Sequence, residues 1–263
     1  MSLLFIHGRW IFCQQLFPSP SIYFGDDSLA LMRRLTPPPG GKVLDLCSGP
    51  GTQAIHCAGL AAEVVAVELN PAAGAVAYLN VAMNGLESRV TLRLGSLYDP
   101  VKGRQFDLIC ANPPLLPIPS NLSFPFVGDG GVDGFAVTRR IVGNAPAHLH
   151  DRGSVQIIGT CLSDGLLPHA IEHLEESLPS TLDALVTVTA HMPCRRGDWQ
   201  FEMLAATVRP SEGSDPRRVL EEALVSARAS HLCYFFARLT EGTGAVVVMD
   251  LSQEHSRRHL WYA

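Results

Sequence analysis

The chain has 263 residues, of which 47% are hydrophobic and 17% charged, and its formal net charge is −5. This composition excludes an intrinsically disordered chain, and the negative charge gives no general attraction to phosphate backbones or anionic membranes. The sequence shows no apolar run of membrane-spanning length and no basic leader, so we expect a soluble cytoplasmic protein without membrane partners. The seven cysteines form no CxxC pair, which fits a reducing compartment, and we expect no metal site.

Residues 1–42 are expected to form a small N-terminal unit beside the way into the active site, followed by one main domain, residues 43–263. Alternating apolar residues predict a hairpin within residues 3–17. Phe17-Pro18-Ser19-Pro20 is typical of a loop. Asp27-Ser28, which precede a run of Leu and Met, predict the start of a capped helix.

From residue 43 on, short apolar runs alternate with segments that are compatible with helices. This alternation predicts a doubly wound α/β fold, in which a mostly parallel sheet carries crossover helices on both faces. The predicted strands are 43–46, 63–68, 90–94, 106–111 and 154–159, and the predicted helices lie near 52–60, 71–83 and 135–149.

The second half of the chain continues the pattern less regularly. An apolar stripe over residues 166–174 predicts a helix, and the Val/Thr-rich residues 183–190 predict a strand. Residues 195–230 are mostly helical in pattern, and the sequence leaves open whether they form a substrate-binding insertion. The strands 233–236 and 245–249 flank a glycine-rich turn, which predicts an antiparallel hairpin at the C-terminal end of the sheet.

A nucleotide-binding loop is indicated at the end of the first main strand. Gly49-Pro50-Gly51 with Ala54 fits the pattern G-x-G-x-x-G/A, in which glycines allow the backbone to approach a ligand closely. Glu68 ends the next predicted strand, nineteen residues after Gly49, where a carboxylate can accept both ribose hydroxyl hydrogens. The alternatives are an ordinary strand-to-helix turn and a strand-end surface charge.

Two kinds of ligand compete for this loop. A dinucleotide oxidoreductase would place a pyrophosphate at the helix N-terminus, whereas a methyltransferase would hold S-adenosylmethionine, which carries a sulfonium and an ammonium group. Asp45, at the end of the strand before the loop, would repel a pyrophosphate and attract these cations. Asp45 could equally cap local backbone amides, which is compatible with either ligand.

A second motif, Asn112-Pro113-Pro114, follows the predicted strand 106–111 and should face the same crevice as the glycine loop. The prolines fix the backbone and have no N–H, so the Asn112 side-chain oxygen and the Pro113 carbonyl can point at one spot. Two such acceptors would bind an amino group and orient its lone pair toward the methyl donor. The alternative is an ordinary proline-rich turn.

With both motifs in place, the chain resembles the class I S-adenosylmethionine-dependent methyltransferases that carry an Asn-Pro-Pro-aromatic motif and methylate amino and amide nitrogens. It is most similar to the glutamine methyltransferases that modify translation release factors. The resemblance covers residues 17–160. It is supported by the loop 17–20, by Gly95-Ser96-Leu97, and by the glycine-rich residues 130–134 before Arg139-Arg140.

This resemblance implies a Rossmann-like fold, S-adenosylmethionine as cofactor, and a role for each matching residue. Asn112 and Pro113 would be the catalytic residues, and Pro114, Leu115, Tyr23 and Phe24 would contact the acceptor. The implied cofactor-binding residues are Asp45, Cys47, Gly49, Gly51, Glu68, Leu69, Ser96, Leu97 and Asn112.

The chain also departs from the family pattern. Leu115 stands where the family has Tyr or Phe, which removes a ring that would stack on a flat acceptor. Ser96 stands where the family often has Asp to meet the adenine amino group. Only 42 residues precede Val43, too few for the helical recognition domain of the release-factor enzymes, so their substrate is not carried over.

We therefore expect N-methylation of an amino or amide nitrogen on a small molecule or on a protein or peptide side chain. An RNA base is a less favoured acceptor, and an NAD(P)-dependent oxidoreductase or a non-catalytic cofactor-binding protein is the alternative from another class. Residues 115–135, rich in Pro, Gly and Asp, are the candidate lid and specificity loop. The sequence does not identify the acceptor, the number of methyl groups added, or the oligomeric state.

Overall fold

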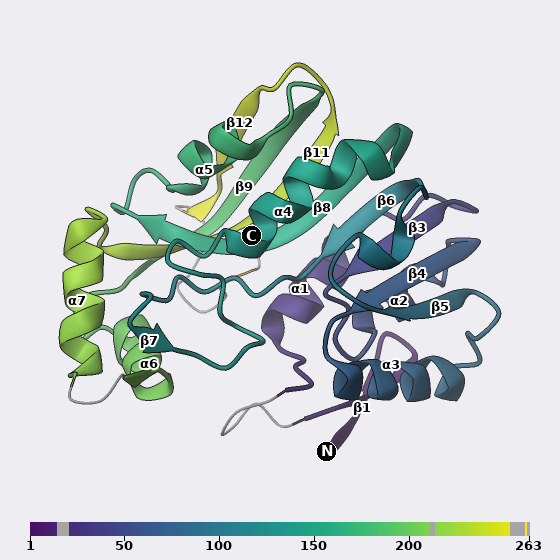
Figure 1. Ribbon diagram of the computed structural model, residues 1–263, viewed down its shortest axis with the longest axis horizontal. Helices are drawn as coiled ribbons and strands as arrows, with labels where there is room; N and C mark the ends of the chain where they lie inside the picture. The colour runs from purple at the N-terminus through teal and green to yellow at the C-terminus, as the bar shows by residue number, and fades with distance from the viewer. Residues whose placement is uncertain (15–20, 211–213, 253–260, 262–263) are drawn as a thin grey trace.

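A mixed sheet of strands in the order β12-β9-β11-β8-β6-β3-β4-β5 forms the centre of the protein in a computed structural model (Figure 1). The structure describes residues 1–14, 21–210, 214–252 and 261. The sheet strands are β3 (Lys42–Leu46), β4 (Glu63–Glu68), β5 (Val90–Leu94), β6 (Phe106–Ala111), β8 (Leu149–Ser163), β9 (Leu182–Pro193), β11 (His231–Glu241) and β12 (Val246–Asp250). Every neighbouring pair is parallel except the two that involve β11, which confirms the expected doubly wound, mostly parallel α/β fold.

The central strands β3, β4 and β6 are mostly apolar because both of their faces are buried. Val43 pairs with Leu108, and Leu44 pairs with Ile109, in the parallel ladder between β3 and β6. Successive side chains point to opposite faces, so Val43 and Leu108 enter one hydrophobic cluster while Leu44 and Ile109 enter the other. A near-continuous apolar run is the expected pattern for such a strand.

Helices supply the remaining side chains of both clusters. Side chains of α1, α2, α3, α6 and α7 pack in the first cluster, and those of α4 and α5 pack in the second. The helices are α1 (Asp26–Arg34), α2 (Thr52–Cys57), α3 (Pro71–Met83), α4 (Ala136–Asn144), α5 (Ala170–Ser177), α6 (Trp199–Thr207) and α7 (Pro216–Ser226), with single 3₁₀ turns at Asp99–Val101 and Ala145–His148. Figure 1 shows α4 and α5 on the near face of the sheet.

Local capping explains where the most accurately predicted helix begins. The Asn70 side chain accepts a hydrogen bond from the backbone N–H of Ala72 at 3.0 Å, and Pro71 occupies the first helical position of α3. The helix predicted over residues 166–174 begins later, at Ala170. Before this helix, the Asp164 carboxylate accepts hydrogen bonds from the N–H groups of Leu166 and Leu167 and holds residues 164–167 in a turn.

The predicted N-terminal hairpin is present as β1 (Ser2–Ile6) and β2 (Arg9–Cys13), which pair antiparallel. Two asparagines hold this hairpin against α3. Asn80, within α3, accepts from the N–H of Phe12 at 2.7 Å, and Asn84, which caps the end of α3, accepts from the N–H of Trp10 at 3.0 Å. The predicted loop 17–20 lies outside the described residues. A further short pair, β7 (Leu122–Ser123) with β10 (Arg209–Pro210), ties the loop after β6 to the end of α6.

The expected antiparallel pairing at the C-terminal end occurs, but not between the two strands that were predicted to form a hairpin. β11 pairs antiparallel with β8 and β9, whereas β12 pairs parallel with β9 on its other side. The turn between β11 and β12 is captured by Asp183, whose carboxylate accepts the N–H groups of Thr243 at 2.7 Å and Ala245 at 2.9 Å. This attachment at the start of β9 directs the chain from β11 past β9 to the edge of the sheet.

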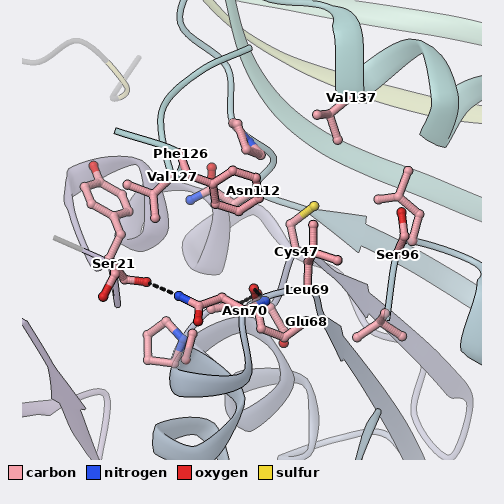
Figure 2. A pocket seen from close by; sticks show the side chains of 18 of the residues that line it. Ser21, Cys47, Glu68, Leu69, Asn70, Ser96, Asn112, Phe126, Val127 and Val137 are labelled. Atoms are coloured by element: carbon pink, nitrogen blue, oxygen red, sulfur yellow. Dashed lines mark hydrogen bonds between the residues drawn. The ribbon is translucent and has the colours of Figure 1, made fainter. Parts of the chain in front are cut away.

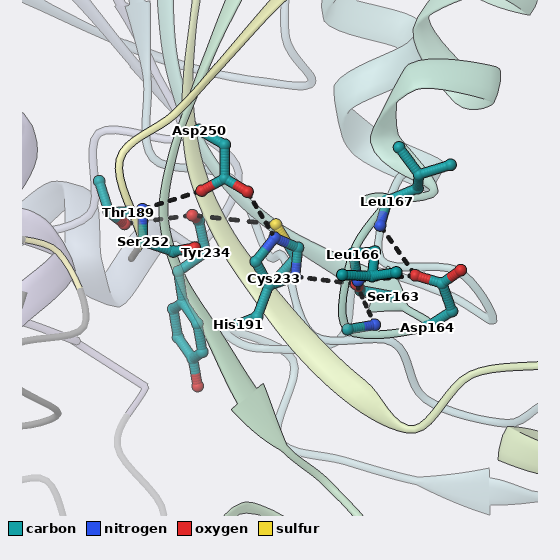
Figure 3. A network of polar contacts seen from close by, with 11 residues as sticks. Ser163, Asp164, Leu166, Leu167, Thr189, His191, Cys233, Tyr234, Asp250 and Ser252 are labelled. Atoms are coloured by element: carbon teal, nitrogen blue, oxygen red, sulfur yellow. Dashed lines mark hydrogen bonds and ion pairs between the residues drawn. The ribbon is translucent and has the colours of Figure 1, made fainter. Parts of the chain in front are cut away.

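A polar strap joins β8, β9 and β12 at their ends (Figure 3). The Ser163 hydroxyl lies 2.8 Å from His191 Nδ1 and accepts from the N–H of Gly165 at 2.9 Å, while His191 Nε2 lies 3.3 Å from Asp250 Oδ2. The Ser163 hydroxyl can donate to His191 Nδ1 when the ring proton is on Nε2, the nitrogen that faces the Asp250 carboxylate. Ser163 is fully buried and cannot meet a substrate, so this Ser-His-Asp arrangement is structural.

None of the helices within the described ranges combines the length and the apolar character that are needed to cross a bilayer.

Replacing Ser163 tests the strap. Ser163→Ala leaves the part-buried His191 Nδ1 and Gly165 N–H without this partner, so we expect a loss of about 1 kcal/mol in the free energy of unfolding. Urea unfolding followed by circular dichroism measures it, with the exposed Ser123→Ala as control. An unfolding midpoint equal to that of the control would contradict the assignment.

Candidate functional site

A cavity that is partly open to solvent lies at the carboxyl ends of β3, β4 and β6 (Figure 2). It is the position where ligands bind in doubly wound sheets. Its wall includes the glycine loop after β3, the residues that follow β4 and β5, and Asn112 after β6. The sequence-predicted residues that line it are Tyr23, Cys47, Gly49, Glu68, Leu69, Ser96, Leu97, Asn112 and Pro114.

The glycine loop has the left-handed backbone that its sequence anticipates. Gly49 and Gly51 have φ of 53° and 81°, and Cys47 adopts φ of 56° although it has a side chain. A Cβ atom on Gly51 would lie 3.2 Å from the Cβ of Ala77, so a glycine there lets the loop pack closely against α3. The Cys47 thiol faces the cavity, where burial raises its pKa above the ordinary range and keeps it protonated.

Glu68 joins the two loops that form the floor of the cavity. One carboxylate oxygen accepts from the N–H of Gly49 at 2.7 Å, and the other accepts from the N–H of Asn70 at 2.7 Å. Asn70 in turn donates to the Ser21 carbonyl at 3.0 Å, which fixes the N-terminal unit at the rim (Figure 2). Each oxygen of Glu68 keeps a further lone pair that can accept from a ligand.

Asn112 is held by the first helix of the chain. Its side-chain nitrogen donates to Asp27 Oδ2 at 3.2 Å and lies 3.3 Å from Ser28 Oγ. Asp27 is buried, and burial raises the pKa of its carboxyl, an effect opposed by hydrogen bonds from Asn112, Tyr23 and Ser28. Since the nitrogen of Asn112 is committed to α1, its Oδ1 is the atom left to accept from a ligand in the cavity.

A cationic residue, Arg140, lies beside Ser96, the residue that was predicted to meet the adenine amino group. The sequence did not assign Arg140 to the cavity. Arg140, on α4, donates to Ser96 Oγ at 3.1 Å, and both residues line the cavity. Leu97 and Val137 provide apolar surface beside them. Leu97 also has a left-handed backbone, with φ of 47°.

Five of the predicted site residues do not line the cavity: Phe24, Asp45, Gly51, Pro113 and Leu115. Leu115 is buried in the first hydrophobic cluster and its carbonyl accepts from Thr160 Oγ1 at 2.5 Å, while Phe24 packs in a small cluster with Cys13 and Met32. Gly51 caps α2, and Pro113 is buried. The side chains of Leu115 and Phe24 therefore do not face the cavity, where the acceptor contacts predicted for them would be made.

Asp45 takes the second of its two predicted roles in this geometry. Its Oδ2 accepts from the N–H of Ala54 at 3.0 Å, and its Oδ1 lies 3.7 Å from the Cys110 thiol. Burial raises the pKa of Asp45 to about 8, although the Ala54 hydrogen bond acts in the opposite direction. The Asp45 carboxyl thus caps a backbone N–H at the start of α2, and its predicted contact with the cofactor stays a prediction.

Comparison with known proteins matches the part of the chain that builds this cavity. A family model described as the methyltransferase small domain matches residues 24–165, which include the glycine loop, Glu68 and Asn112. The chain belongs to the methyltransferase small domain family. The expected resemblance to class I S-adenosylmethionine-dependent methyltransferases is confirmed.

Individual relatives agree with this family. The ribosomal protein uL3 glutamine methyltransferase of Bradyrhizobium diazoefficiens is 38% identical over 143 residues, which are 51% of this chain and 45% of that protein. A putative protein N5-glutamine methyltransferase of Methanocaldococcus jannaschii is 34% identical over 152 residues, 55% of this chain and 75% of its own length. This chain spans about half the length of the uL3 methyltransferases that it matches.

Solved structures support the methyltransferase fold. A putative transferase from Pyrococcus horikoshii has a TM-score of 0.53 at 12% identity and covers 92% of this chain and 72% of its own. The tRNA m1G37 methyltransferase of M. jannaschii has a TM-score of 0.51 at 12% identity, with 92% and 57% covered. At such low identity the likeness concerns the fold alone.

The cavity fits the cofactor of this methyltransferase family. Within the described residues, the hydroxyls of Ser48 and Thr52 are buried without a hydrogen-bond partner, and both residues line the cavity. Buried polar groups are nearly always paired in folded proteins, so these hydroxyls indicate a polar ligand. With the remaining lone pairs of Glu68, they suit the ribose and amino-acid groups of S-adenosylmethionine.

Sequence reasoning missed several residues of the methyltransferase cavity. Asp27 and Ser28 were recognised only as a helix start, although they also orient Asn112. Arg140 and Phe126 were not assigned to the site individually, because their contribution depends on how α4 and the loop after β6 fold back over the sheet. The pair Asp26-Asp27 is the one signal in the sequence: a helix start needs a single acidic cap, and the structure shows that the second acid, Asp27, is buried at the site.

The raised pKa of Asp45 predicts a stability change with pH. The folded state keeps a proton that the unfolded state, with an ordinary aspartate pKa of about 3.9, releases, so this contribution is lost as pH rises from about 4 to about 8. Asp45→Asn removes the titration. We expect the free energy of unfolding of the wild type, relative to this variant, to fall as pH rises through that window. A pH-independent difference in urea unfolding would contradict a raised pKa.

Proposed function

We propose that this protein is an S-adenosylmethionine-dependent N-methyltransferase whose acceptor is the side-chain amide of a protein. The observation that carries the proposal is the orientation of Asn112. Its nitrogen is bound by Asp27 and Ser28, so its oxygen is presented to the cavity that the glycine loop and Glu68 share. An oriented acceptor oxygen is what an amide –NH2 group requires for binding.

The residues of the site would act mainly by positioning and charge complementarity. S-adenosylmethionine supplies a methyl group on a positively charged sulfur. Asn112 Oδ1 would accept one N–H of the acceptor, which turns the nitrogen lone pair toward the cavity and stabilises positive charge that develops on the nitrogen. Pro113 is proposed to contribute its carbonyl to the same –NH2 group, and Glu68 to hold the ribose. Phe126 and Val127, which line the cavity, would limit access of water.

The relatives support an amide acceptor over the other nitrogens that the sequence left open. The names of three of them specify glutamine: the uL3, the putative N5-glutamine and the release factor glutamine methyltransferases. The NAD(P)-dependent alternative is disfavoured by the methyltransferase family of residues 24–165. Seven free thiols, and relatives named for ribosomal proteins and release factors, support a cytoplasmic location for the proposed activity.

Replacement of Asn112 tests the proposal. The wild type is assayed with tritiated S-adenosylmethionine and a capped Ala-Ala-Gln-Ala-Ala peptide, and Asn112→Ala is expected to lower kcat/KM by about 100-fold or more. The affinity of this variant for S-adenosylhomocysteine, measured by calorimetry, should stay within about threefold of wild type, because Asn112 Oδ1 is proposed to bind the acceptor and Glu68 the ribose. A threefold change is well below the tenfold change that 1.4 kcal/mol gives.

The matched control is Asn84→Ala, which alters an asparagine that holds the N-terminal hairpin rather than the cavity. Equal turnover of the Asn112 and Asn84 variants would contradict the catalytic role of Asn112. Methylation of RNA and not of the peptide by the wild type would contradict the proposed acceptor.

A further inference from the structure

Phe126 is an exposed aromatic residue in the wall of the methyltransferase cavity. Its side chain is 59% exposed, and it shares the cavity wall with Asn112 and Pro114. Figure 2 shows Phe126 and Val127 on the same side of the cavity as Asn112, across from Glu68 and Asn70. A single exposed phenylalanine needs no explanation on an open surface, but here it lies where an acceptor would have to enter.

The backbone holds Phe126 in this position. Phe126 and Val127 are the central residues of a turn that is closed by a hydrogen bond from the N–H of Gly128 to the Pro125 carbonyl at 2.9 Å. The N–H of Leu116 donates to the Gly128 carbonyl at 2.9 Å. The turn is thus attached directly to the segment that follows Asn112-Pro113-Pro114.

Two further features keep this attachment in one arrangement. The N–H of Gly130 donates to the Leu116 carbonyl at 2.9 Å, which adds a second rung to the connection. A Cβ atom on Gly128 would lie 2.5 Å from the Phe124 ring, so the turn and the neighbouring ring are packed without spare room. Phe126 is therefore presented by a braced turn and not by a free lid.

Leu115 cannot supply an acceptor contact, because its side chain is buried and its carbonyl is bonded to Thr160. We propose that Phe126 is the acceptor-binding aromatic of this protein and that its ring stacks on the planar carboxamide of the acceptor side chain. This inference rests on the proposed function and adds a specificity-determining residue to it. The exposed face of the ring matches a planar carboxamide, which can lie flat against it.

Substitution of Phe126 by leucine keeps apolar volume and removes the ring. With capped Ala-Ala-Gln-Ala-Ala as substrate, Phe126→Leu should raise KM about tenfold and leave kcat nearly unchanged, whereas Phe126→Tyr should restore the wild-type KM. Affinity for S-adenosylhomocysteine should not change in either variant. The control is Phe5→Leu, which alters a phenylalanine of matched exposure, 61%, on the N-terminal hairpin.

Nuclear magnetic resonance provides a readout that does not depend on turnover. Propionamide, which carries the same carboxamide as glutamine, is titrated into protein loaded with S-adenosylhomocysteine. Its methylene protons should show an upfield ring-current shift with the wild type and lose it with Phe126→Leu.

The outcomes separate the two proposals. A wild type that shifts the propionamide resonances but methylates no glutamine peptide contradicts the proposed function and supports the stacking site. Unchanged KM and ring-current shift in Phe126→Leu overturn the role of Phe126, whatever the acceptor. A loss of S-adenosylhomocysteine affinity equal to the loss of peptide affinity overturns it as well, because the ring then packs on the cofactor. Selective loss of RNA methylation in this variant would assign the ring to a nucleobase and overturn the amide claim.

Discussion

The parallel register of β4, β3 and β6 is the constraint on which the rest of the site depends. Ala66, Asp45 and Cys110 lie side by side in this ladder, so the residues that follow each strand emerge at one edge of the sheet. A slip by one residue would turn every apolar side chain of a strand to the opposite face, and both hydrophobic clusters oppose it. The cores therefore fix the cavity without contributing to its chemistry.

Buried carboxyl groups convert this edge into an oriented site. Glu68 fixes the glycine loop and the start of α3 by accepting hydrogen bonds from two backbone N–H groups. Asp27 fixes Asn112 by accepting a hydrogen bond from its side-chain nitrogen. Burying an acidic group is costly unless donors surround it, which is why each has several partners here. The free energy spent in this way sets the direction of the remaining lone pairs before any ligand binds, which is how preorganised sites work.

The N-terminal unit takes part in this arrangement at two points. Its backbone at Ser21 accepts from Asn70, and its helix α1 provides Asp27. The boundary at residue 42 that the sequence suggested separates two stretches of chain, but the polar contacts of the cavity cross it. On the other side of the cavity, the braced turn that carries Phe126 is bonded to the segment after Asn112, so the acceptor side is built from neighbouring loops.

Much of the fold and part of the site were predictable from local sequence. The bounds of α3 followed from Asn70-Pro71, and the strands β3, β4 and β6 followed from short apolar runs that are buried on both faces. The placement of Glu68 and Asn112 at one edge followed from the general geometry of parallel sheets. These predictions succeeded because each depends on one strand or one turn.

Apart from the local turn that Asp164 imposes before α5, the differences from the sequence predictions involve residues that are distant in sequence. The turn before β12 has the composition of a hairpin, yet Asp183, more than fifty residues earlier, captures its backbone and redirects the strand to β9. Leu115 follows the motif directly, but Thr160 and the first hydrophobic cluster turn it inward. The burial of Asp45 against Cys110 and the start of α2 is likewise not visible in the sequence.

The central claim is that Glu68 holds a ribose while Asp27 keeps the oxygen of Asn112 facing the acceptor. A crystal structure of the full chain with S-adenosylhomocysteine tests this most directly. We predict both ribose hydroxyls at about 3 Å from the Glu68 carboxylate, with the Asn112 side chain still at hydrogen-bond distance from Asp27. A ribose bound away from Glu68, or an Asn112 side chain that has left Asp27, would contradict the account.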